Sequence, residues 1–265
     1  YDKRNIFMTT AINDATFGRM EHQDPQKKNS GRLPKVLGVI PARGSSKRFP
    51  NKNISMLSGK PLIAWTIEAA QKAKGLTDYL VSSDALLIID VARNYGAPVP
   101  FTRPSELATD TVRNIEVVAH ALQFMEAKKQ IVYDIIVLLQ PTSPIRNPVH
   151  IDEAVNRLWQ SDLDSVVSVK GPYKKRDPIL KAIRNGVLED YCPVDDPADT
   201  EPFYLYNAAL YGVKRNYFVK YNKLISPRHI PLMMDPIYSV DVDTEADFLM
   251  AETYMNFLAK TKQQQ

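Results

Sequence analysis

Short apolar segments alternate with longer amphipathic segments along most of the chain. Residues 36–40 form an aliphatic run bounded by prolines, which predicts a strand buried on both faces. Similar runs predict strands at residues 79–83, 99–101, 133–139, 164–170, 205–213 and 238–241. Apolar residues three or four positions apart predict helices at residues 61–74, 86–95, 111–128, 148–160 and 245–258. This alternation is typical of an α/β fold with a mostly parallel, doubly wound sheet.

Two segments do not follow this pattern. Residues 1–34 are polar and lack the apolar centre of a secretion signal, so we interpret them as a flexible N-terminal extension before a domain at 35–265. Residues 171–202 are rich in prolines and acidic residues and are interpreted as an insertion or arm. No apolar run approaches the roughly 20 residues that span a bilayer, so we expect no membrane partner.

Composition narrows the possible functions. Hydrophobic residues make up 44% of the 265, enough for a full core. The net charge of +4 is mild and no basic-aromatic stripe is present, so we expect a small polyanion rather than nucleic acid as partner. Cys192 is the only cysteine, which indicates a reducing compartment: the cytoplasm, or the nucleus in a eukaryote.

The loop after the first predicted strand carries the strongest chemical signal. Arg43, Lys47, Arg48 and Lys52 place four cations within ten positions, among small residues that allow backbone N–H groups to approach phosphate oxygens. The loop has neither the Walker A nor the GxGxxG spacing. A solvated basic turn is the alternative interpretation.

Two further polar groups follow predicted strands. In Asp241-Val242-Asp243, the alternation of side chains along an extended segment places both carboxylates on one face. Together with phosphate and water oxygens, two carboxylates suit Mg²⁺. The alternative is that Asp243 caps the following helix. Residues 140–143 follow a buried strand and should lie at the rim of a site, or else form a stiff turn.

Together these motifs resemble the acylneuraminate cytidylyltransferase family, which contains CMP-sialic acid, CMP-legionaminic acid and other CMP-nonulosonic acid synthetases. The resemblance covers residues 35–258. Its most specific motifs are IPARG at 40–44, KN at 52–53, RPSELATDT at 103–111, LQPTSP at 139–144 and DVDTE at 241–245. It implies a fold of the nucleotide-diphospho-sugar transferase type. It also implies a homodimer, with 171–202 as an arm that reaches a second subunit.

The resemblance further implies transfer of CMP from CTP to the anomeric hydroxyl of an acidic nine-carbon or Kdo-type sugar, with release of pyrophosphate. The catalytic residues it implies are Arg43, Lys52 and Asp241. The implied nucleotide-binding residues are Ala42, Arg43, Gly44, Ser45, Ser46, Lys47, Lys52, Asn53, Arg103 and Asn114. The implied substrate-binding residues are Gln140, Thr142, Ser143 and Asn207. Asp241 and Asp243 would bind Mg²⁺ or another divalent cation, and either could be the general base.

Some of these assignments have simpler alternatives. Arg103 could instead form a surface ion pair, and Asn114 could be a polar residue on a helix surface. Asp84 is interpreted as a turn residue. Asn207 is disfavoured within a strand, which favours a role in the site.

Three departures from the family pattern concern the loop and the sugar. Ser45 replaces a usual glycine, which matters if that position needs a positive φ. Leu205 stands where sialate-activating members have an arginine, and no basic residue lies between positions 192 and 205. The alternatives are therefore a related nucleotidyltransferase with another acid or nucleotide, or an inactive nucleotide-binding homologue.

Overall fold

The computed structural model describes residues 31–45, 48–174, 181–184, 187–190 and 202–263. The chain divides into two units, Tyr1–Leu33 and Pro34–Gln265, and the second unit contains all the elements below. The predicted extension at 1–34 lies almost wholly outside the described residues.

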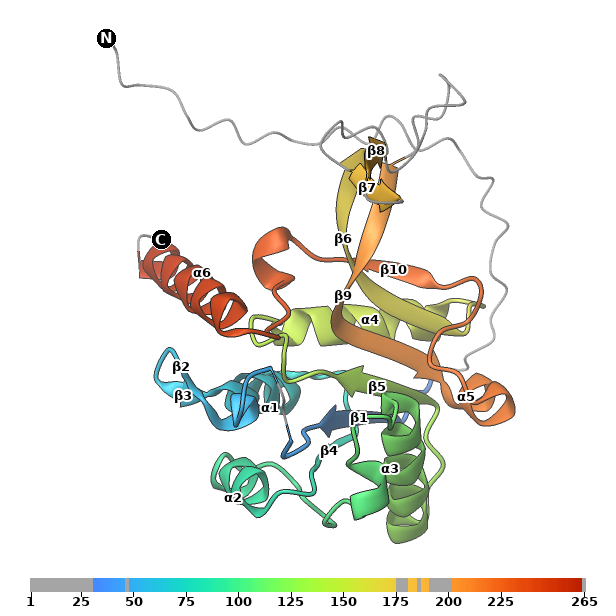
Figure 1. Cartoon of the computed structure of the whole chain (residues 1–265). Coiled ribbons are helices and arrows are strands. Elements are labelled where there is room, and N and C mark those ends of the chain that lie inside the picture. The colour runs from blue at the N-terminus through green and yellow to red at the C-terminus, as the bar shows by residue number, and fades with distance from the viewer. Residues whose placement is uncertain (1–30, 46–47, 175–180, 185–186, 191–201, 264–265) are drawn as a thin grey trace. The chain divides into compact units, whose positions relative to one another are not determined.

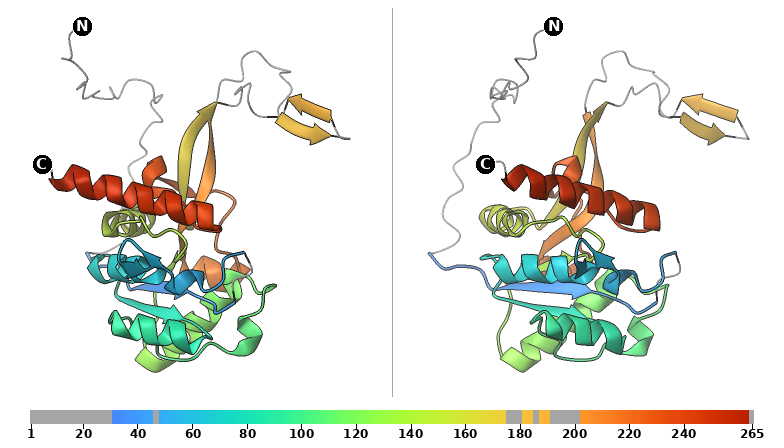
Figure 2. Two further views of the ribbon diagram at one scale, coloured as in Figure 1. Left: turned by 60° about the vertical axis from the view of Figure 1, so that its left-hand side comes forward. Right: turned by 90° about the vertical axis from the view of Figure 1, so that its left-hand side faces the viewer.

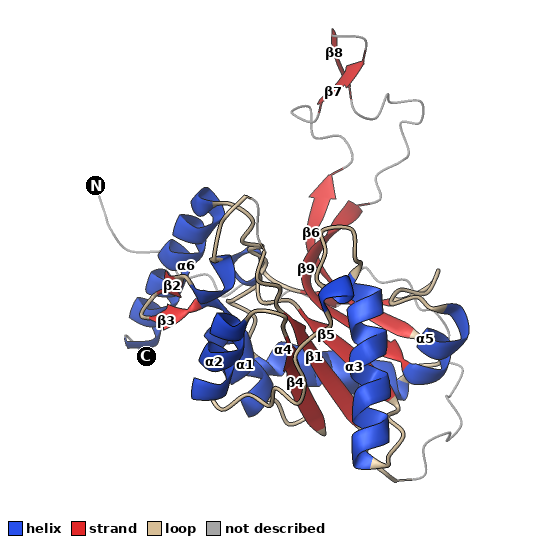
Figure 3. Ribbon diagram, turned by 60° about the horizontal axis from the view of Figure 1, so that its bottom comes forward, coloured by secondary structure: helices blue, strands red, loops and turns tan. Residues whose placement is uncertain are grey.

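A six-stranded sheet forms the centre of the second unit, in the order β10-β6-β9-β5-β1-β4. The strands are β1 (Val36–Pro41), β4 (Asp78–Ser82), β5 (Ile135–Leu139), β6 (Ser165–Lys174), β9 (Pro202–Lys214) and β10 (Ile230–Met233). β1 runs parallel to β4 and β5, and β10 runs parallel to β6, whereas β9 is antiparallel to both of its neighbours. The predicted mostly parallel sheet is confirmed (Figures 1 and 3).

Helices cover both faces of this sheet. The helices are α1 (Leu62–Lys72), α2 (Leu86–Asn94), α3 (Asn114–Lys129), α4 (Pro148–Gln160), α5 (Arg215–Tyr221) and α6 (Glu245–Gln263), the last of which packs on α1 and β2 rather than on the sheet. Figures 1 and 2 show α1 and α4 on one face and α3 on the other. Short 3₁₀ turns η1 (Lys52–Ile54), η2 (Ser105–Leu107) and η3 (Pro236–Tyr238) lie in the connections. Two small hairpins complete the elements: β2 (Met56–Leu57) with β3 (Lys60–Pro61), and β7 (Lys181–Arg184) with β8 (Val187–Asp190).

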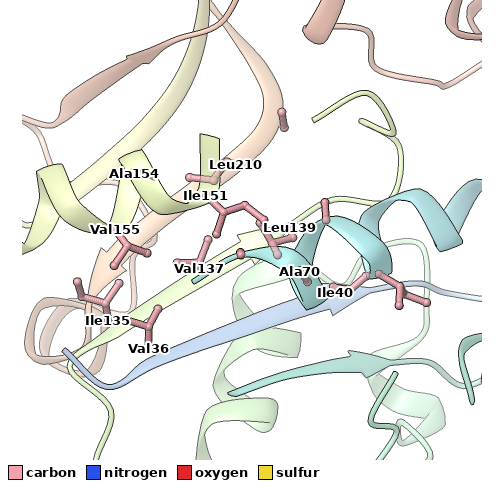
Figure 4. Packing of buried hydrophobic residues seen from close by; sticks show 14 of the residues in the cluster. Val36, Ile40, Ala70, Ile135, Val137, Leu139, Ile151, Ala154, Val155 and Leu210 are labelled. Carbon is pink, nitrogen blue, oxygen red and sulfur yellow. The ribbon is translucent and has the colours of Figure 1, made fainter. Parts of the chain in front are cut away.

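The core follows from the alternation of side chains along the strands. In β5, Ile135, Val137 and Leu139 pack against α1 and α4, as Figure 4 shows, while Ile136 and Leu138 pack against α3. All five are buried, which stabilises the fold by about 1.5–3 kcal/mol for each side chain relative to exposure. A strand that is aliphatic at every position can therefore only lie between two helical layers.

Two predicted strands are wrong. Residues 99–101 form no strand, because Pro98 and Pro100 lack the N–H groups that a ladder needs. Residues 238–241 form no strand either: Val240 and Val242 are buried in alternation, but against α6 and the loop before β2, and not beside another strand. The edge strand β10 and the short helix α5 were not predicted.

The predicted arm at 171–202 is partly a continuation of the sheet. β6 extends to Lys174 and β9 begins at Pro202, and the two strands pair as far as Lys174 with Pro202. The hairpin of β7 and β8 lies between them in the sequence. The rest of the segment, including Cys192, lies outside the described residues.

Candidate active site

A cavity of about 370 Å³ opens where β1 and β5 end and α3 begins. This is the edge of an open α/β sheet at which ligands bind. Its lining residues are Pro41, Arg43, Ser45, Lys52, Asn53, Arg103, Leu107, Thr109, Asp110, Val112, Arg113, Asn114, Val117, Gln140, Pro141 and Thr142. The structure thus brings together eight of the predicted site residues: Arg43, Ser45, Lys52, Asn53, Arg103, Asn114, Gln140 and Thr142.

The loop after β1 is held by contacts on both sides. The Gly44 N–H donates to Asp84 Oδ1 at 3.0 Å, and Asn53 Nδ2 donates to the Arg43 carbonyl at 3.2 Å. A Cβ atom at Gly44 would lie 2.7 Å from Cβ of Ala85, so only glycine fits without a shift. Asp84 therefore does more than form a turn, because it anchors the loop.

The serine substitution in this loop is compatible with its backbone. Among the described residues, five non-glycine residues have a positive φ, and Ser45 is not one of them. Serine therefore causes no backbone strain at this position. Ser46 and Lys47, both predicted to bind phosphate, lie outside the described residues.

Arg43 projects beside the cavity and forms an ion pair. Its Nη1 lies 2.6 Å from Asp110 Oδ1, and the two side chains are 39% and 38% exposed. Solvent screens a pair this exposed, so the contact is weak and a triphosphate can compete with it. Arg43 is thus available as a phosphate ligand.

Lys52 connects the loop to the aspartate segment. It is 8% exposed, and its Nζ donates to the Val242 carbonyl at 2.6 Å and to Asp243 Oδ1 at 3.0 Å. The other carboxylate oxygen of Asp243 accepts from Arg48 at 3.0 Å. Asp243 does not cap α6, because Thr244 Oγ1 accepts from the Asp247 N–H and Asp247 binds the N–H groups of Asp243 and Thr244. The capping interpretation of Asp243 is wrong.

Asp241 differs sharply from Asp243. Its Oδ1 is buried and has no hydrogen-bond partner within the described residues, and the same holds for Thr142 Oγ1. Burial raises the pKa of Asp241 and the charge of Asp243 adds to the rise, while the charge of Lys52 opposes it. A buried, unsatisfied carboxylate oxygen beside a second carboxylate fits a hard divalent cation. The described residues hold no cluster of three or more His, Cys, Asp or Glu side chains, so a cation here would need phosphate or water oxygens as well.

Arg103 and Asn114 also line the cavity. Arg103 is 5% exposed and donates to the hydroxyl of Ser82 at 3.0 Å and to its carbonyl oxygen, so the surface ion-pair interpretation is wrong. Burial lowers the pKa of Arg103 to about 10, which still leaves it charged at neutral pH. Asn114 is the first residue of the 16-residue helix α3, whose N-terminal N–H groups and dipole favour an anion in the cavity.

Six predicted site residues do not line this cavity although their positions are described: Asp241 and Asp243, which meet it only through the contact of Asp243 with Lys52, and Ala42, Gly44, Ser143 and Asn207. Ala42 and Ser143 are buried, and Gly44 lines a second cavity, with Asn51 and Ala85, instead. Asn207 is 3% exposed on β9; its Nδ2 donates to Ser239 Oγ at 2.9 Å and its Oδ1 accepts from the Ala209 N–H at 3.2 Å. Both ends of this amide are therefore already bonded.

Sequence reasoning missed part of the wall. Thr109, Asp110, Val112 and Arg113 line the cavity between η2 and α3. The signal that could have found them is the motif at 103–111, which leads directly into the first turn of α3.

The chain matches the sequence model of the cytidylyltransferase family over residues 37–257. It belongs to the cytidylyltransferase family. The CMP-N,N'-diacetyllegionaminic acid synthase of Legionella pneumophila is 36% identical over 232 residues, which cover 83% of this chain and 96% of that protein. The N-acylneuraminate cytidylyltransferase of Escherichia coli is 34% identical over 225 residues, which cover 83% of this chain and 52% of that protein. The chain thus spans about half the length of the second relative.

This cytidylyltransferase also resembles solved structures. A CMP:2-keto-3-deoxy-manno-octonic acid synthetase complexed with CTP superposes with a TM-score of 0.63 at 17% identity, covering 84% of this chain and 98% of the other. At that identity the likeness concerns the fold alone. The predicted fold and family are confirmed, and the chain is a nucleotidyltransferase. None of the helices in the described part is long and apolar enough to cross a bilayer.

Proposed function

We propose that this cytidylyltransferase is a CMP-nonulosonate synthetase, which transfers CMP from CTP to the anomeric hydroxyl of a sialic-acid-like sugar acid. The observation that carries the proposal is the cavity that Arg43, Lys52 and Arg103 line, in which Lys52 also bonds to Asp243. Three cations around one cavity, one of them bonded to a carboxylate, suit a triphosphate that enters with a divalent cation.

The reaction follows from this arrangement. The anomeric oxygen attacks the α-phosphorus of CTP and forms a P–O bond, while the bond to the bridging α–β oxygen breaks and pyrophosphate leaves. Arg43 and Lys52 bind the triphosphate and stabilise the charge that develops on the leaving group. The α3 N-terminus and Asn114 favour the anionic nucleotide. The hydroxyl proton passes to a carboxylate, for which Asp241 is the candidate because its buried Oδ1 has no hydrogen-bond partner in the described structure.

A divalent cation completes the proposal. Asp241 and Asp243 would hold it, and when bound it would polarise the phosphate oxygens and lower the pKa of the attacking hydroxyl. Asp243 would then share its oxygens between the cation and the side chains of Lys52 and Arg48. Gln140 and Thr142, at the end of β5, are the proposed contacts of the sugar, with Asn207 as a support behind them.

A homodimer is part of the same proposal. Tyr204, Leu205 and Tyr206 on β9 are 43%, 45% and 51% exposed, and Tyr173 stacks on Phe203 where β6 and β9 extend together. Such a run of exposed aromatic and aliphatic side chains suits a contact with a second subunit. Light scattering on the purified chain tests it, and a Tyr204→Asp variant should shift a dimer toward monomer.

Pyrophosphate release tests the proposed activity. The purified chain is incubated with CTP, Mg²⁺ and a panel of legionaminic, pseudaminic, sialic and Kdo-type acids, and product is identified as a CMP-sugar. Turnover with at least one acid and none without Mg²⁺ is expected. CTP binding without turnover across the panel would instead support the inactive homologue, and tighter binding of UTP or GTP than of CTP would contradict the choice of nucleotide.

A further inference from the structure

Arg146 is a buried cation beneath the active-site rim. Its side chain is 2% exposed and lies in the connection between β5 and α4. One guanidinium nitrogen, Nη1, donates to the carbonyl oxygens of Gln140, at 3.3 Å, and of Ala209. The other, Nη2, donates to Thr66 Oγ1 at 2.9 Å.

None of these three acceptors is charged. Burial lowers the pKa of Arg146 to about 9, and no carboxylate of the described residues forms an ion pair with it. A buried guanidinium without an acid is costly, and apolar side chains fill such positions without that cost. The hydrogen-bond donors of the rigid guanidinium group therefore matter more at position 146 than the space that the side chain fills.

The fork joins the two halves of the site. Gln140 directly follows β5 and lines the cavity. Ala209 lies in a bulge of β9. Val167 of β6 pairs with Tyr211, and Val169 pairs with Tyr206, so two residues of β6 lie opposite five residues of β9. Ala208 in that bulge has a φ of 60°, and Asn207 Oδ1 accepts from the Ala209 N–H.

We infer that Arg146 is a positioning residue that fixes the β9 bulge around Asn207 against the Gln140 end of β5, and so places the sugar relative to the nucleotide. This inference rests on the proposed function. Transfer requires the sugar oxygen to lie about 3–3.5 Å from the α-phosphorus, and a displacement of about 1 Å can cost a hundredfold in rate. A fork that binds both strands limits that displacement without touching either substrate.

A purely structural role would leave a different signature. Loss of core stability lowers the folded fraction and hence the apparent kcat, but it leaves the KM values and the binding constant for CTP unchanged. Loss of positioning raises the KM for the sugar acid and lowers kcat, while the CTP site at β1 and α3 remains intact. The two roles are therefore separable in one set of measurements.

The experiment compares Arg146→Lys with Thr66→Val and with a control, Arg215→Met. Arg146→Lys keeps the charge and loses the fork. Thr66→Val keeps the side-chain shape but removes one acceptor of Arg146, together with the long 3.5 Å bond from Thr66 Oγ1 to the Gln140 carbonyl. Arg215 pairs with Glu126 at 2.7 Å, at the far end of β9, and its loss weakens the fold away from the site. Steady-state kinetics, CTP calorimetry, thermal melting and hydrogen exchange of the backbone are measured on each.

For Arg146→Lys we expect the KM for the sugar acid to rise about tenfold and kcat to fall about tenfold or more, with the Kd for CTP within about twofold of wild type. Thr66→Val should raise the KM for the sugar acid and lower kcat by about threefold each. Arg215→Met should lower the melting temperature and leave both KM values unchanged. Exchange at residues 205–212 should rise in Arg146→Lys and Thr66→Val, and exchange at 36–41 should not.

Unchanged exchange at 205–212 in both site variants, or an unchanged KM for the sugar acid, would overturn the inference. If Arg146→Lys does not fold, Thr66→Val decides alone. If the wild-type chain activates no sugar acid, the proposed function is wrong. The hydrogen-exchange data would still decide whether Arg146 fixes the β9 bulge.

Discussion

Lys52 Nζ lies 3.0 Å from Asp243 Oδ1, although the two residues are 191 positions apart. The contact joins the loop after β1 to the segment before α6, so the proposed phosphate site and the proposed metal site share a single ion pair. Lys52 is the more buried partner, with a side chain 10% exposed against 41% for Asp243. Each charge therefore depends on the other for its position.

The first prediction concerns this pair. Asp243→Asn should lower CTP turnover at least tenfold and the free energy of unfolding by about 1 kcal/mol, because Lys52 keeps only the Val242 carbonyl as a strong acceptor. Kinetics and denaturant titration measure the two effects. Glu245→Gln, two residues further along in the first turn of α6, is the matched control and should change neither. Full activity in Asp243→Asn would remove Asp243 from the metal site.

The second prediction concerns the close approach at Gly44. Gly44→Ala should weaken CTP binding about tenfold, because its new Cβ would lie 2.7 Å from Cβ of Ala85 and displace the loop. Calorimetry with CTP gives the binding constant. Adding Ala85→Gly removes the opposing atom and should restore much of the affinity. If the double variant binds no better than Gly44→Ala, the steric explanation fails.

Asp241 should limit stability and support turnover. Asp241→Asn removes a buried charge whose Oδ1 has no partner in the described structure, so we expect a melting temperature equal to or up to about 4 °C above wild type. Turnover should fall by at least a hundredfold, and the rise in melting temperature that Mg²⁺ and CTP together give the wild type should shrink. An active Asp241→Asn variant would contradict both proposed roles of this carboxylate.

Lys170 is a cation beside Leu205, the position at which the resemblance to the family led us to expect an arginine. In the antiparallel ladder Lys170 pairs directly with Leu205, so both side chains leave the same face of the sheet. Lys170→Gln should raise the KM for the sugar acid severalfold and leave the Kd for CTP unchanged. The double variant Lys170→Leu with Leu205→Arg, which moves the cation to the opposite strand, should bring the KM for the sugar acid part of the way back to that of the wild type. Leu205→Arg alone instead places two cations opposite each other. Unchanged KM in Lys170→Gln would exclude this role.

The pair of Glu126 and Arg215 predicts a pH dependence of stability. Burial alone would raise the pKa of Glu126. Hydrogen bonds from Arg215 and the Tyr133 N–H nevertheless hold this pKa below its ordinary value. A carboxylate whose pKa is lower in the folded protein than in the unfolded chain stabilises the fold at a pH above its pKa in the unfolded chain. This contribution disappears as the pH falls through the pKa of the folded state. Glu126→Gln should therefore cost about 1 kcal/mol at pH 7 and nothing at a pH below both pKa values. Denaturant titrations at the two pH values check this.

Much of the fold was predictable because it depends on local patterns. The strand at 36–40, the loop after it and the helix at 148–160 each carry their signal in adjacent residues, and the structure places them close to the predicted bounds. The strand at 238–241 failed because burial with a period of two does not reveal whether a neighbouring strand exists. Here Val242 bonds instead to the Thr142 carbonyl at 2.7 Å.

The sequence predicted which residues belong to the site, but not how they contact each other. The cations and carboxylates were visible in the sequence, whereas the pairing of Lys52 with Asp243 depends on how the sheet closes. Asn207 was expected in the site because asparagine is disfavoured within strands, and at the sugar because of the family resemblance, but its amide bonds within a bulge that no sequence pattern predicted. Arg146 lies two residues after the motif at 139–144 and was not predicted, and its burial among neutral acceptors is visible only in the structure.

The position of β9 in the sheet sets an order of assembly during synthesis. β9 lies between β5 and β6, yet it follows both in the sequence, so a growing chain has a gap in its sheet until residue 214 has left the ribosome. The carboxylate that neutralises Lys52 emerges later still, at residue 243. Incomplete chains therefore expose unpaired strand edges and an uncompensated lysine, which makes them targets for chaperones and incapable of holding the nucleotide in the proposed way.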